Sequence, residues 1–354
     1  MSLRNASPAL AAALLFGAST PFAKLLVGDV PPLLLAGLLY LGSGLGLSLL
    51  LLLRRLQAGS SAEKQALQIP RAEWPWLLGA VAFGGLLGPA FLMLGLTQTS
   101  GATASLLLNL EGVFTAVMAW LVFRENADRQ IVLGMVVIVL GGLLLAWAPD
   151  AGGFSLSAGA LLIVAACLCW AVDNNLTRKV STNDAMLVAA IKGLLAGISN
   201  TAFALLSGAH WPAAASIGGS MAVGFLGYGL SLTLFVVALR TLGTARTGAY
   251  FSIAPLFGVI ISLAIWPSMP GPLFWLAAAL MALGIWLHLR ERHAHEHTHE
   301  PLAHNHRHVH DEHHQHSHDF AWDGTEPHSH PHAHTALTHS HPHYPDIHHR
   351  HQHS

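Results

Sequence analysis

Ten long apolar runs follow one another through the first 290 residues, with short Gly/Pro or charged breaks between them. A soluble core cannot bury so many runs, whereas a lipid bilayer accepts each one as a helix of about 20 residues. Charged residues make up only 10% of the chain, against about 25% in typical soluble domains. The sequence therefore predicts an all-α polytopic membrane protein. The expected transmembrane helices are Pro8–Val27, Pro32–Leu53, Trp74–Leu96, Gly101–Phe123, Ile131–Ala148, Leu156–Thr177, Asp184–Leu206, Ala215–Leu239, Thr247–Trp266 and Pro272–Leu289.

The positive charges predict how these helices are oriented, because cytoplasmic loops of membrane proteins are enriched in Lys and Arg. With the N-terminus in the cytoplasm, 15 of the 17 Lys and Arg residues fall on that side, and Lys24 and Lys192 fall within spans. We therefore expect a bacterial inner-membrane protein with both termini in the cytoplasm. The cytoplasmic set is Arg4, Arg54, Arg55, Lys64, Arg71, Arg124, Arg129, Arg178, Lys179, Arg240, Arg246, Arg290, Arg292, Arg307 and Arg350.

The two halves of this apolar body resemble each other. Phe16–Lys24 parallels Trp170–Arg178, and Thr103–Phe114 parallels Arg246–Phe257. Because each half has an odd number of spans, the second half is inverted relative to the first. Inverted repeats around a midplane site are typical of secondary transporters. The expected organisation is a first repeat at residues 8–148, a second repeat at 156–289 and a tail at 293–354.

Three segments also resemble a known family. Thr99–Glu125, Phe16–Lys24 and Ala254–Phe257 are similar to signatures of EamA-type permeases in the drug/metabolite transporter superfamily. The resemblance covers roughly residues 8–290. It implies ten helices in two five-helix EamA repeats, without ATP-binding machinery. Many family members carry proline in the fourth helix where Glu111-Gly112 stands here, and this departure argues against a substrate of the family's metabolite exporters.

Ionisable side chains within the spans are candidates for the transport pathway, because such groups are costly in a bilayer and usually face a cavity or a partner. Glu111 is either a cation ligand or proton-coupling carboxylate, or the structural partner of a lysine. Asp173 either lines the pathway or stabilises the end of its helix. Lys192 either neutralises a carboxylate between transport cycles or pairs permanently with Asp173. Lys24, near a span end, is expected to extend its ammonium toward the interface.

Neutral polar residues within the spans complete the candidate pathway. Asn109, Asn174 and Asn175 flank the two carboxylates in sequence and can supply carbonyl oxygens. Asparagines in membranes more commonly hydrogen bond between helices, and the same alternative applies to Asn200. Cys167 and Cys169 point to different faces of one helix, so they cannot chelate as a pair and are expected to pack.

The tail, His293–Ser354, contains all of the 25 histidines except His210 and His288, mostly in His-X-His runs. Neutral imidazole is a good ligand for nickel, cobalt, zinc and copper, and eight carboxylates in the tail attract cations. We expect a disordered segment that binds transition-metal cations and releases them as the pH falls. The predicted ligands are His293, His295, His297, His299, His304, His306, His308, His310, His313, His314, His316, His318, His328, His330, His332, His334, His339, His341 and His343.

The leading hypothesis is a secondary transporter that exports a transition-metal cation, nickel or cobalt first, by proton antiport. The combination of body and tail resembles nickel/cobalt-resistance efflux permeases with His-rich tails. One alternative is an EamA-type exporter of amino acids or other small metabolites with a metal-sensing tail. Another is a membrane-anchored metal store. We expect no required cofactor and no nucleic-acid partner. The expected partners are the lipid bilayer and the cargo, and the sequence does not decide whether the protein forms a homodimer. The sequence shows no nucleophile–base constellation or phosphate-binding loop, so we expect no enzyme.

Overall fold

Residue contacts divide the chain of this computed structural model into two units, Met1–Glu291 (the body) and Arg292–Ser354 (the tail). The structure describes residues 3–57, 69–123, 129–147, 156–180, 183–242, 251–267 and 269–290 of the body, and residues 294–299, 302–308, 328–334 and 337–342 of the tail.

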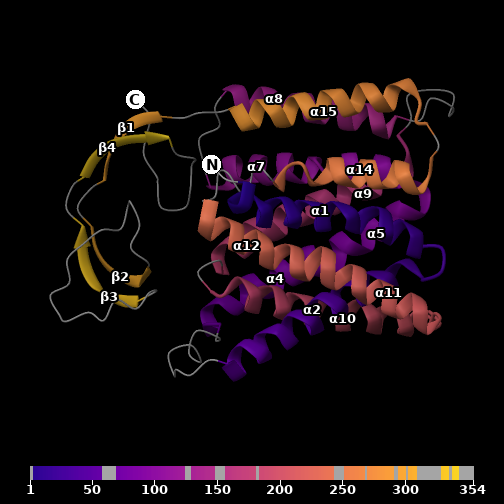
Figure 1. Ribbon diagram of the computed structural model, residues 1–354, viewed down its shortest axis with the longest axis horizontal. Coiled ribbons are helices and arrows are strands. Elements are labelled where there is room, and N and C mark those ends of the chain that lie inside the picture. The colour runs from indigo at the N-terminus through magenta and orange to yellow at the C-terminus, as the bar shows by residue number, and fades with distance from the viewer. Residues whose placement is uncertain are drawn as a thin grey trace. The chain divides into compact units, whose positions relative to one another are not determined.

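The described body is built of helices, with one isolated antiparallel bridge between Trp147 and Leu156 (Figure 1). Its first half contains α1 (Leu3–Leu26), α2 (Pro32–Gln57), η1 (Arg71–Glu73), α4 (Trp74–Ala80), η2 (Val81–Leu87), α5 (Gly88–Gln98), α6 (Gly101–Leu107), α7 (Leu110–Phe123) and α8 (Arg129–Ala146). Its second half contains α9 (Ala158–Thr177), η4 (Arg178–Val180), α10 (Ala185–Leu206), α11 (Ala214–Gly224), η5 (Phe225–Leu230), α12 (Ser231–Leu242), α14 (Ala254–Ile265) and α15 (Pro272–Arg290).

Seven helices in the described residues are long and apolar enough to cross a membrane. Three shorter apolar helices, at Val132–Ala146, Ala254–Ile265 and Pro272–Leu287, lie where the fifth, ninth and tenth spans were predicted. The positions of the apolar helices therefore agree with the hydropathy pattern, and the body is a multi-pass membrane protein by length and composition.

The fourth predicted span, Gly101–Phe123, contains a candidate membrane span at Gly101–Met118, but a turn at Leu108–Asn109 divides it into α6 and α7. The Asn109 amide nitrogen donates to Leu106 O at 3.1 Å, and its side-chain Nδ2 donates to the same oxygen at 2.8 Å. Asparagine side chains compete in this way with regular helical bonding. A turn at Ser252–Ile253 likewise precedes α14 in the predicted ninth span.

The third and eighth spans are continuous, as predicted, but each contains a π-helical segment, η2 and η5. A π-helix has one extra residue per turn and occurs mostly as single turns, frequently at functional sites. Both segments contain two glycines, Gly84 and Gly85 in η2 and Gly227 and Gly229 in η5. Sequence periodicity over a uniformly apolar span does not show such a local change of helix type.

Helix contacts made by one half of the body have counterparts in the other half. α2 packs along α10, and α8 packs along α15 (Figure 1). η2 packs on α9 and α10, while η5 packs on α1 and α2. Close approach of α2 to α10 requires glycine, since a Cβ on Gly193 would lie 2.7 Å from Gly44 N. The exchange of equivalent contacts supports the predicted repeat.

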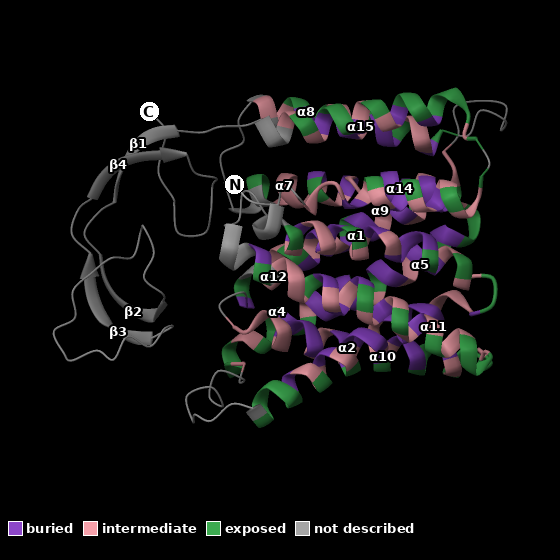
Figure 2. Ribbon diagram, viewed as in Figure 1, coloured by how far each residue is buried: buried purple, intermediate pink, exposed green. Residues whose placement is uncertain are grey.

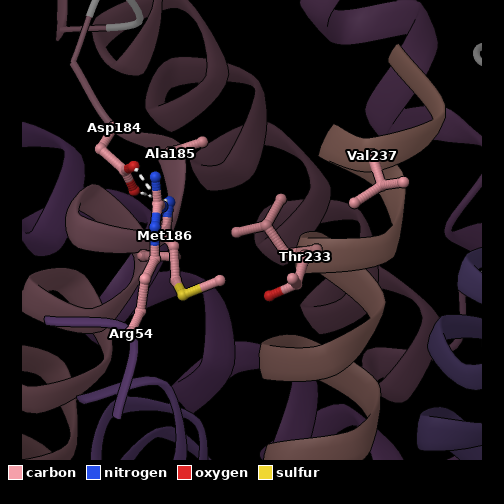
Figure 3. Close-up of a pocket in the computed structure, with 8 residues that line it drawn as sticks. Arg54, Asp184, Ala185, Met186, Thr233 and Val237 are labelled. Atoms are coloured by element: carbon pink, nitrogen blue, oxygen red, sulfur yellow. Dashed lines mark hydrogen bonds and ion pairs between the residues drawn. The ribbon is translucent and has the colours of Figure 1, made fainter. Parts of the chain in front are cut away.

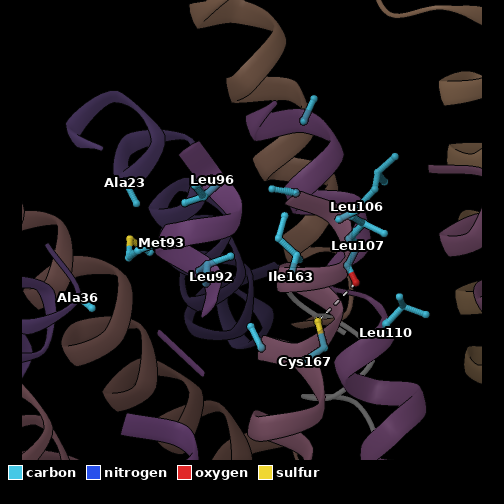
Figure 4. Packing of buried hydrophobic residues seen from close by; sticks show 14 of the residues in the cluster. Ala23, Ala36, Leu92, Met93, Leu96, Leu106, Leu107, Leu110, Ile163 and Cys167 are labelled. Carbon is cyan, nitrogen blue, oxygen red and sulfur yellow. Dashed lines mark hydrogen bonds between the residues drawn. The ribbon is translucent and has the colours of Figure 1, made fainter. Parts of the chain in front are cut away.

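The largest buried cluster joins α5, α6 and α9, where Leu96, Leu107 and Ile163 are fully buried (Figure 4). Cys167 packs in this cluster, and its thiol donates to Leu107 O at 3.6 Å, so the expectation of a packing cysteine is confirmed. The outer residues of α8 and α15 are large, apolar and exposed (Figure 2). A lipid environment accommodates such a surface, whereas water does not.

The described tail residues form β-strands, which differs from the disordered segment expected from the composition. β1 (Ala294–His299) pairs antiparallel with β4 (Leu337–Pro342), and β2 (Leu302–His308) pairs antiparallel with β3 (His328–His334). The alternation of His with other residues has the period of two that suits a strand. In the register, His297 is opposite His339 and His306 is opposite His330.

Candidate functional site

Asp173 and Lys192 form a salt bridge inside the body, between α9 and α10. Lys192 Nζ lies 2.5 Å from Asp173 Oδ1, and the side chains are only 16% and 10% exposed. Thr177 Oγ1 donates to the same carboxylate oxygen at 2.8 Å and accepts from Lys192 Nζ at 3.1 Å. The structure shows Lys192 paired with Asp173.

Glu111 is the second residue of α7, directly after the turn that breaks the fourth span. Its Oε1 accepts a hydrogen bond from Asn174 Nδ2 at 2.9 Å. Neither candidate lysine pairs with it, because Lys192 binds Asp173 and Lys24 donates to Leu96 O. Within the described residues, Glu111 is thus a half-buried carboxyl group whose partner is an amide and not a cation.

Three consecutive residues of α9 connect these two carboxyl groups. Asp173 binds α10, while Asn174 and Asn175 donate to α7, at Thr115 Oγ1 (3.2 Å) and Thr115 O (3.4 Å) respectively. Asn174 is exposed although it lies within an apolar span. Exposed polar groups in spans usually face a water-filled cavity. The structure therefore brings Glu111, Asp173, Asn174, Asn175 and Lys192 into one neighbourhood.

Asn109 does not join this group. Its side chain donates to Leu106 O within the turn and approaches Met281 Sδ at 3.9 Å. Gly112 has open space around it, since an added Cβ would meet nothing within 4 Å. The turn at Asn109, and not the glycine, is the structural feature beside Glu111.

Two backbone carbonyls of η2 accept side-chain hydrogen bonds from three helices. Gly84 O accepts from Tyr40 Oη at 2.8 Å and from Trp170 Nε1 at 3.0 Å. Gly85 O accepts from Asn200 Nδ2 at 2.7 Å. Pro89 has no N–H to offer to the carbonyls four and five residues before it, which are Gly85 O and Gly84 O. The predictions missed Tyr40 and Trp170, although Gly84-Gly85 followed by Pro89 was a signal.

Asp173 lies directly against η2. A Cβ on Gly84 would lie 1.8 Å from Asp173 Oδ2, so only glycine fits. In the other half, a Cβ on Gly227 of η5 would lie 2.6 Å from Ser19 Cβ. The repeat alignment matches Ser19 with Asp173, so equivalent residues of α1 and α9 meet equivalent π segments. One position carries a charge and the other a hydroxyl.

Aromatic side chains gather where α1, α2 and η5 meet. The Tyr40 and Tyr228 rings stack at 5.7 Å, and Phe16 contacts Tyr228 edge-on at 6.2 Å. Phe16 also lies 5.3 Å from Phe251, which lies 4.8 Å from Phe235. All five rings are half-buried. Of these rings, Tyr40 reaches the crossing of α9 and η2, through its hydrogen bond to Gly84 O.

A small pocket of about 60 Å³ lies between α2, α10 and α12 (Figure 3). Arg54 Nη1 at its edge pairs with Asp184 Oδ2 at 3.1 Å, and Asp184 also caps α10 through the amides of Met186 and Leu187. Ligand pockets usually have about 300–1,000 Å³. This pocket is therefore too small for an organic cargo.

No group of three or more His, Cys, Asp or Glu side chains among the described residues could hold a metal ion. The imidazoles of the tail lie outside the described side chains, and seven predicted ligands lie outside the described residues altogether. These seven are His293, His310, His313, His314, His316, His318 and His343. The predicted metal sites of the tail stay predictions.

The sequence matches the EamA-like transporter family twice, at residues 6–147 and 157–290. The chain belongs to the EamA-like transporter family. Each match covers one half of the body, in agreement with the exchange of equivalent helix contacts. Members of this family are transporters and not enzymes, so this EamA-like protein is a transporter.

Individual relatives of this EamA-like transporter agree with that assignment. It is 25% identical to an uncharacterized transporter of Methanothermobacter thermautotrophicus over 72% of this chain and 76% of that protein. It is 24% identical to the uncharacterized transporter YyaM of Bacillus subtilis over 53% of this chain and 64% of that protein. A solved crystal structure of a protein shares its fold, with a TM-score of 0.57, 21% identity and coverage of 79% of this chain and 95% of that one.

Proposed function

We propose that this EamA-like transporter is a secondary exporter in which Glu111 exchanges a proton for cargo. The observation that supports this is the position of Glu111, half-buried at a helix break within a span and bonded to Asn174 instead of a cation. A carboxyl group there can be protonated or ionised without leaving a basic partner unpaired. Broken helices at the midplane commonly form the sites where transporters bind cargo and coupling ions.

Asp173 has a different role in this proposal. Its charge is balanced by Lys192, so it is held in a fixed position and does not exchange a proton in each cycle. It positions α9 so that Asn174, the next residue, reaches Glu111. The exposed Asn174 amide and the Glu111 carboxyl group then contact the cargo together.

A transition-metal cation, with nickel or cobalt first, is the cargo that the tail supports. Its His-X-His runs and eight carboxylates would collect such cations. The distribution of Lys and Arg supports cytoplasmic termini, so the tail would gather or buffer metal on the side from which an exporter loads. Proton entry would then displace the cation from Glu111.

A small organic metabolite, such as an amino acid, is the second candidate, favoured by a different observation. The half-buried aromatic cluster reaches the α9 crossing through Tyr40, and aromatic rings contact organic cargo more often than metal ions. Lys192 also forms an ion pair with Asp173, so that Glu111 is the carboxylate of this described neighbourhood that is available to a cation. In this case the tail would sense metal.

The two cargos are separated by metal accumulation in cells that lack the gene and express one of three chains. These are the intact chain, the chain truncated after Arg292, and Glu111→Gln. Nickel, cobalt, zinc and copper are measured together with growth tolerance. The Glu111→Gln substitution is a matched replacement, because the amide keeps a carbonyl oxygen for the Asn174 hydrogen bond and loses only the titratable group.

Metal export predicts low cellular nickel or cobalt with the intact chain, a weaker effect after truncation and none with Glu111→Gln. Equal metal contents in all strains would refute metal export and direct the same comparison to amino acids in the medium. A phenotype for truncation but not for Glu111→Gln would instead indicate a membrane-anchored metal store.

A further inference from the structure

Tyr40 contacts both π segments of the body at once. Its hydroxyl donates to Gly84 O of η2, and its ring stacks on Tyr228 of η5 at 5.7 Å with an interplanar angle of 17°. The two π segments occupy equivalent places in the two halves of the fold. Tyr40 therefore links equivalent elements of the two repeats with a single side chain.

Each π segment is a place where its span can change shape. A π turn returns to α-helical geometry when one residue is released from it, which shifts the helix on one side relative to the other. Alternating access in inverted-repeat transporters moves one repeat against the other around a fixed site. A joint change at η2 and η5 would produce such a movement, whereas a change at one segment alone would not.

The hydrogen bonds on η2 show how the segments can be joined. Gly84 O moves when η2 changes shape, and both Tyr40 and Trp170 are bound to it. Only Tyr40, of these two donors, also contacts η5 among the interactions of the described residues. Trp170 satisfies the same oxygen from α9 and provides a natural control for the loss of one hydrogen bond.

We propose that Tyr40 couples the shape of η2 to the shape of η5, so that the third and eighth spans bend together during transport. The inference rests on transport by the family fold and is independent of the cargo. Tyr40 acts as a positioning residue, because its effect is exerted through the two backbone segments. Its hydroxyl provides one connection and its ring provides the other.

The coupling is measured with spin-label pairs in the full-length chain in phospholipid vesicles, at acidic and alkaline pH and with or without nickel. One pair, at Leu78 and Leu94, spans η2, and the other, at Ala215 and Leu232, spans η5. The buried Cys167 and Cys169 are replaced by serine. Distance distributions give the fraction of molecules in which each span is bent.

In the unsubstituted Tyr40 chain, the two fractions are expected to agree under every condition. In Tyr40→Phe, which keeps the ring and loses the hydroxyl, they are expected to differ roughly threefold, the ratio typical of one interhelical hydrogen bond in a membrane. Tyr228→Leu, which loses the stack, should separate them as well. Trp170→Phe should leave them equal.

Equal fractions in Tyr40→Phe and Tyr228→Leu would overturn the proposal, as would an identical effect of Trp170→Phe. A single fixed distance across either segment of the parent chain would also overturn it. Spans that bend together without any response to protons or nickel would leave the coupling intact and refute the proposed exchange at Glu111. Failure of one proposal is thus distinguishable from failure of the other.

Discussion

Where α9 crosses η2, a salt bridge and three side-chain hydrogen bonds surround the backbone. Where α1 crosses η5, the described contacts are two serines, Ser19 and Ser231, and aromatic rings. The two crossings are equivalent in the repeat, so the fold does not explain the difference. Polar groups in a membrane are costly and are retained where they have a function. The comparison shows that the repeat gives both crossings the same helix arrangement, whereas, among the described residues, only the crossing of α9 and η2 contains a salt bridge.

The largest expected effect comes from removing the cation at the polar crossing. Lys192→Met leaves the buried Asp173 carboxylate unpaired, which typically destabilises a protein by about 3–5 kcal/mol. Ser19→Ala, at the equivalent crossing, should cost less than about 1 kcal/mol because it removes a neutral hydroxyl, which bonds to Phe16 O of its own helix and to the side chain of Tyr228. Unfolding in detergent micelles measures both.

The double variant Asp173→Asn/Lys192→Met should recover most of the lost stability, because it removes both charges. No recovery would show that the salt bridge is not the reason for the loss. Equal effects of Lys192→Met and Ser19→Ala would remove the energetic contrast between the crossings.

The next largest loss of stability is expected from adding a methyl group at Gly84. Gly84→Ala places a Cβ against the Asp173 carboxylate, and overpacking of this kind costs about 1–3 kcal/mol. Gly112→Ala is the matched control, since its new Cβ would meet nothing within 4 Å. Thermal unfolding followed by size-exclusion chromatography should show a lower Tm for Gly84→Ala only, and a lower Tm for both would contradict the packing at η2.

Removing one neutral hydrogen bond from each crossing tests the same contrast more finely. Asn200→Ala leaves Gly85 O without its side-chain donor, and we expect a cost of about 1 kcal/mol. Ser231→Ala removes a bond to Ala12 O on α1, an oxygen that regular helical bonding also satisfies, so its cost should be under about 0.6 kcal/mol. Chemical unfolding of the two variants side by side gives the difference, and a larger cost for Ser231→Ala would reverse the comparison.

The smallest loss of stability is expected outside the crossings, for the substitution Arg54→Ala. The ion pair of Arg54 with Asp184 is half exposed on the arginine side, and such pairs contribute about 0.2–1 kcal/mol. Asp184→Ala should cost more, about 1 kcal/mol, because Asp184 also caps α10. Unfolding at low and high salt separates the ion pair from the helix cap, since salt screens only the ion pair. A salt-dependent loss of stability in Asp184→Ala but not in the Arg54 variant would contradict this division.

Hydropathy was sufficient to predict where the apolar helices lie, because long apolar runs have few alternatives to a membrane span. It did not predict the turn at Asn109 or the π segments, which depend on local competition for backbone hydrogen bonds. Asp173 and Lys192 could be expected to pair, since both are ionisable within neighbouring spans. The contact of Asp173 with Gly84 depends on how the repeats pack and has no sequence signal of its own.

In the tail, the sequence predicts the chemistry of the side chains but not the structure. The composition of the tail predicts metal binding from side-chain chemistry alone, but composition does not predict which strands pair with each other. The strands put His306 opposite His330, residues separated by a long stretch of chain. The period of two was visible in the His-X-His runs, while the partner of each strand was not.

Proton movement in vesicles reconstituted with Glu111→Gln tests the central claim most directly. The cargo identified by the accumulation measurements is added outside, and a trapped pH-sensitive dye reports proton exchange. The unsubstituted transporter and Glu111→Asp should move protons when cargo is added, and Glu111→Gln should not. Proton movement by Glu111→Gln at the rate of the unsubstituted transporter would show that Glu111 is not the coupling carboxyl group.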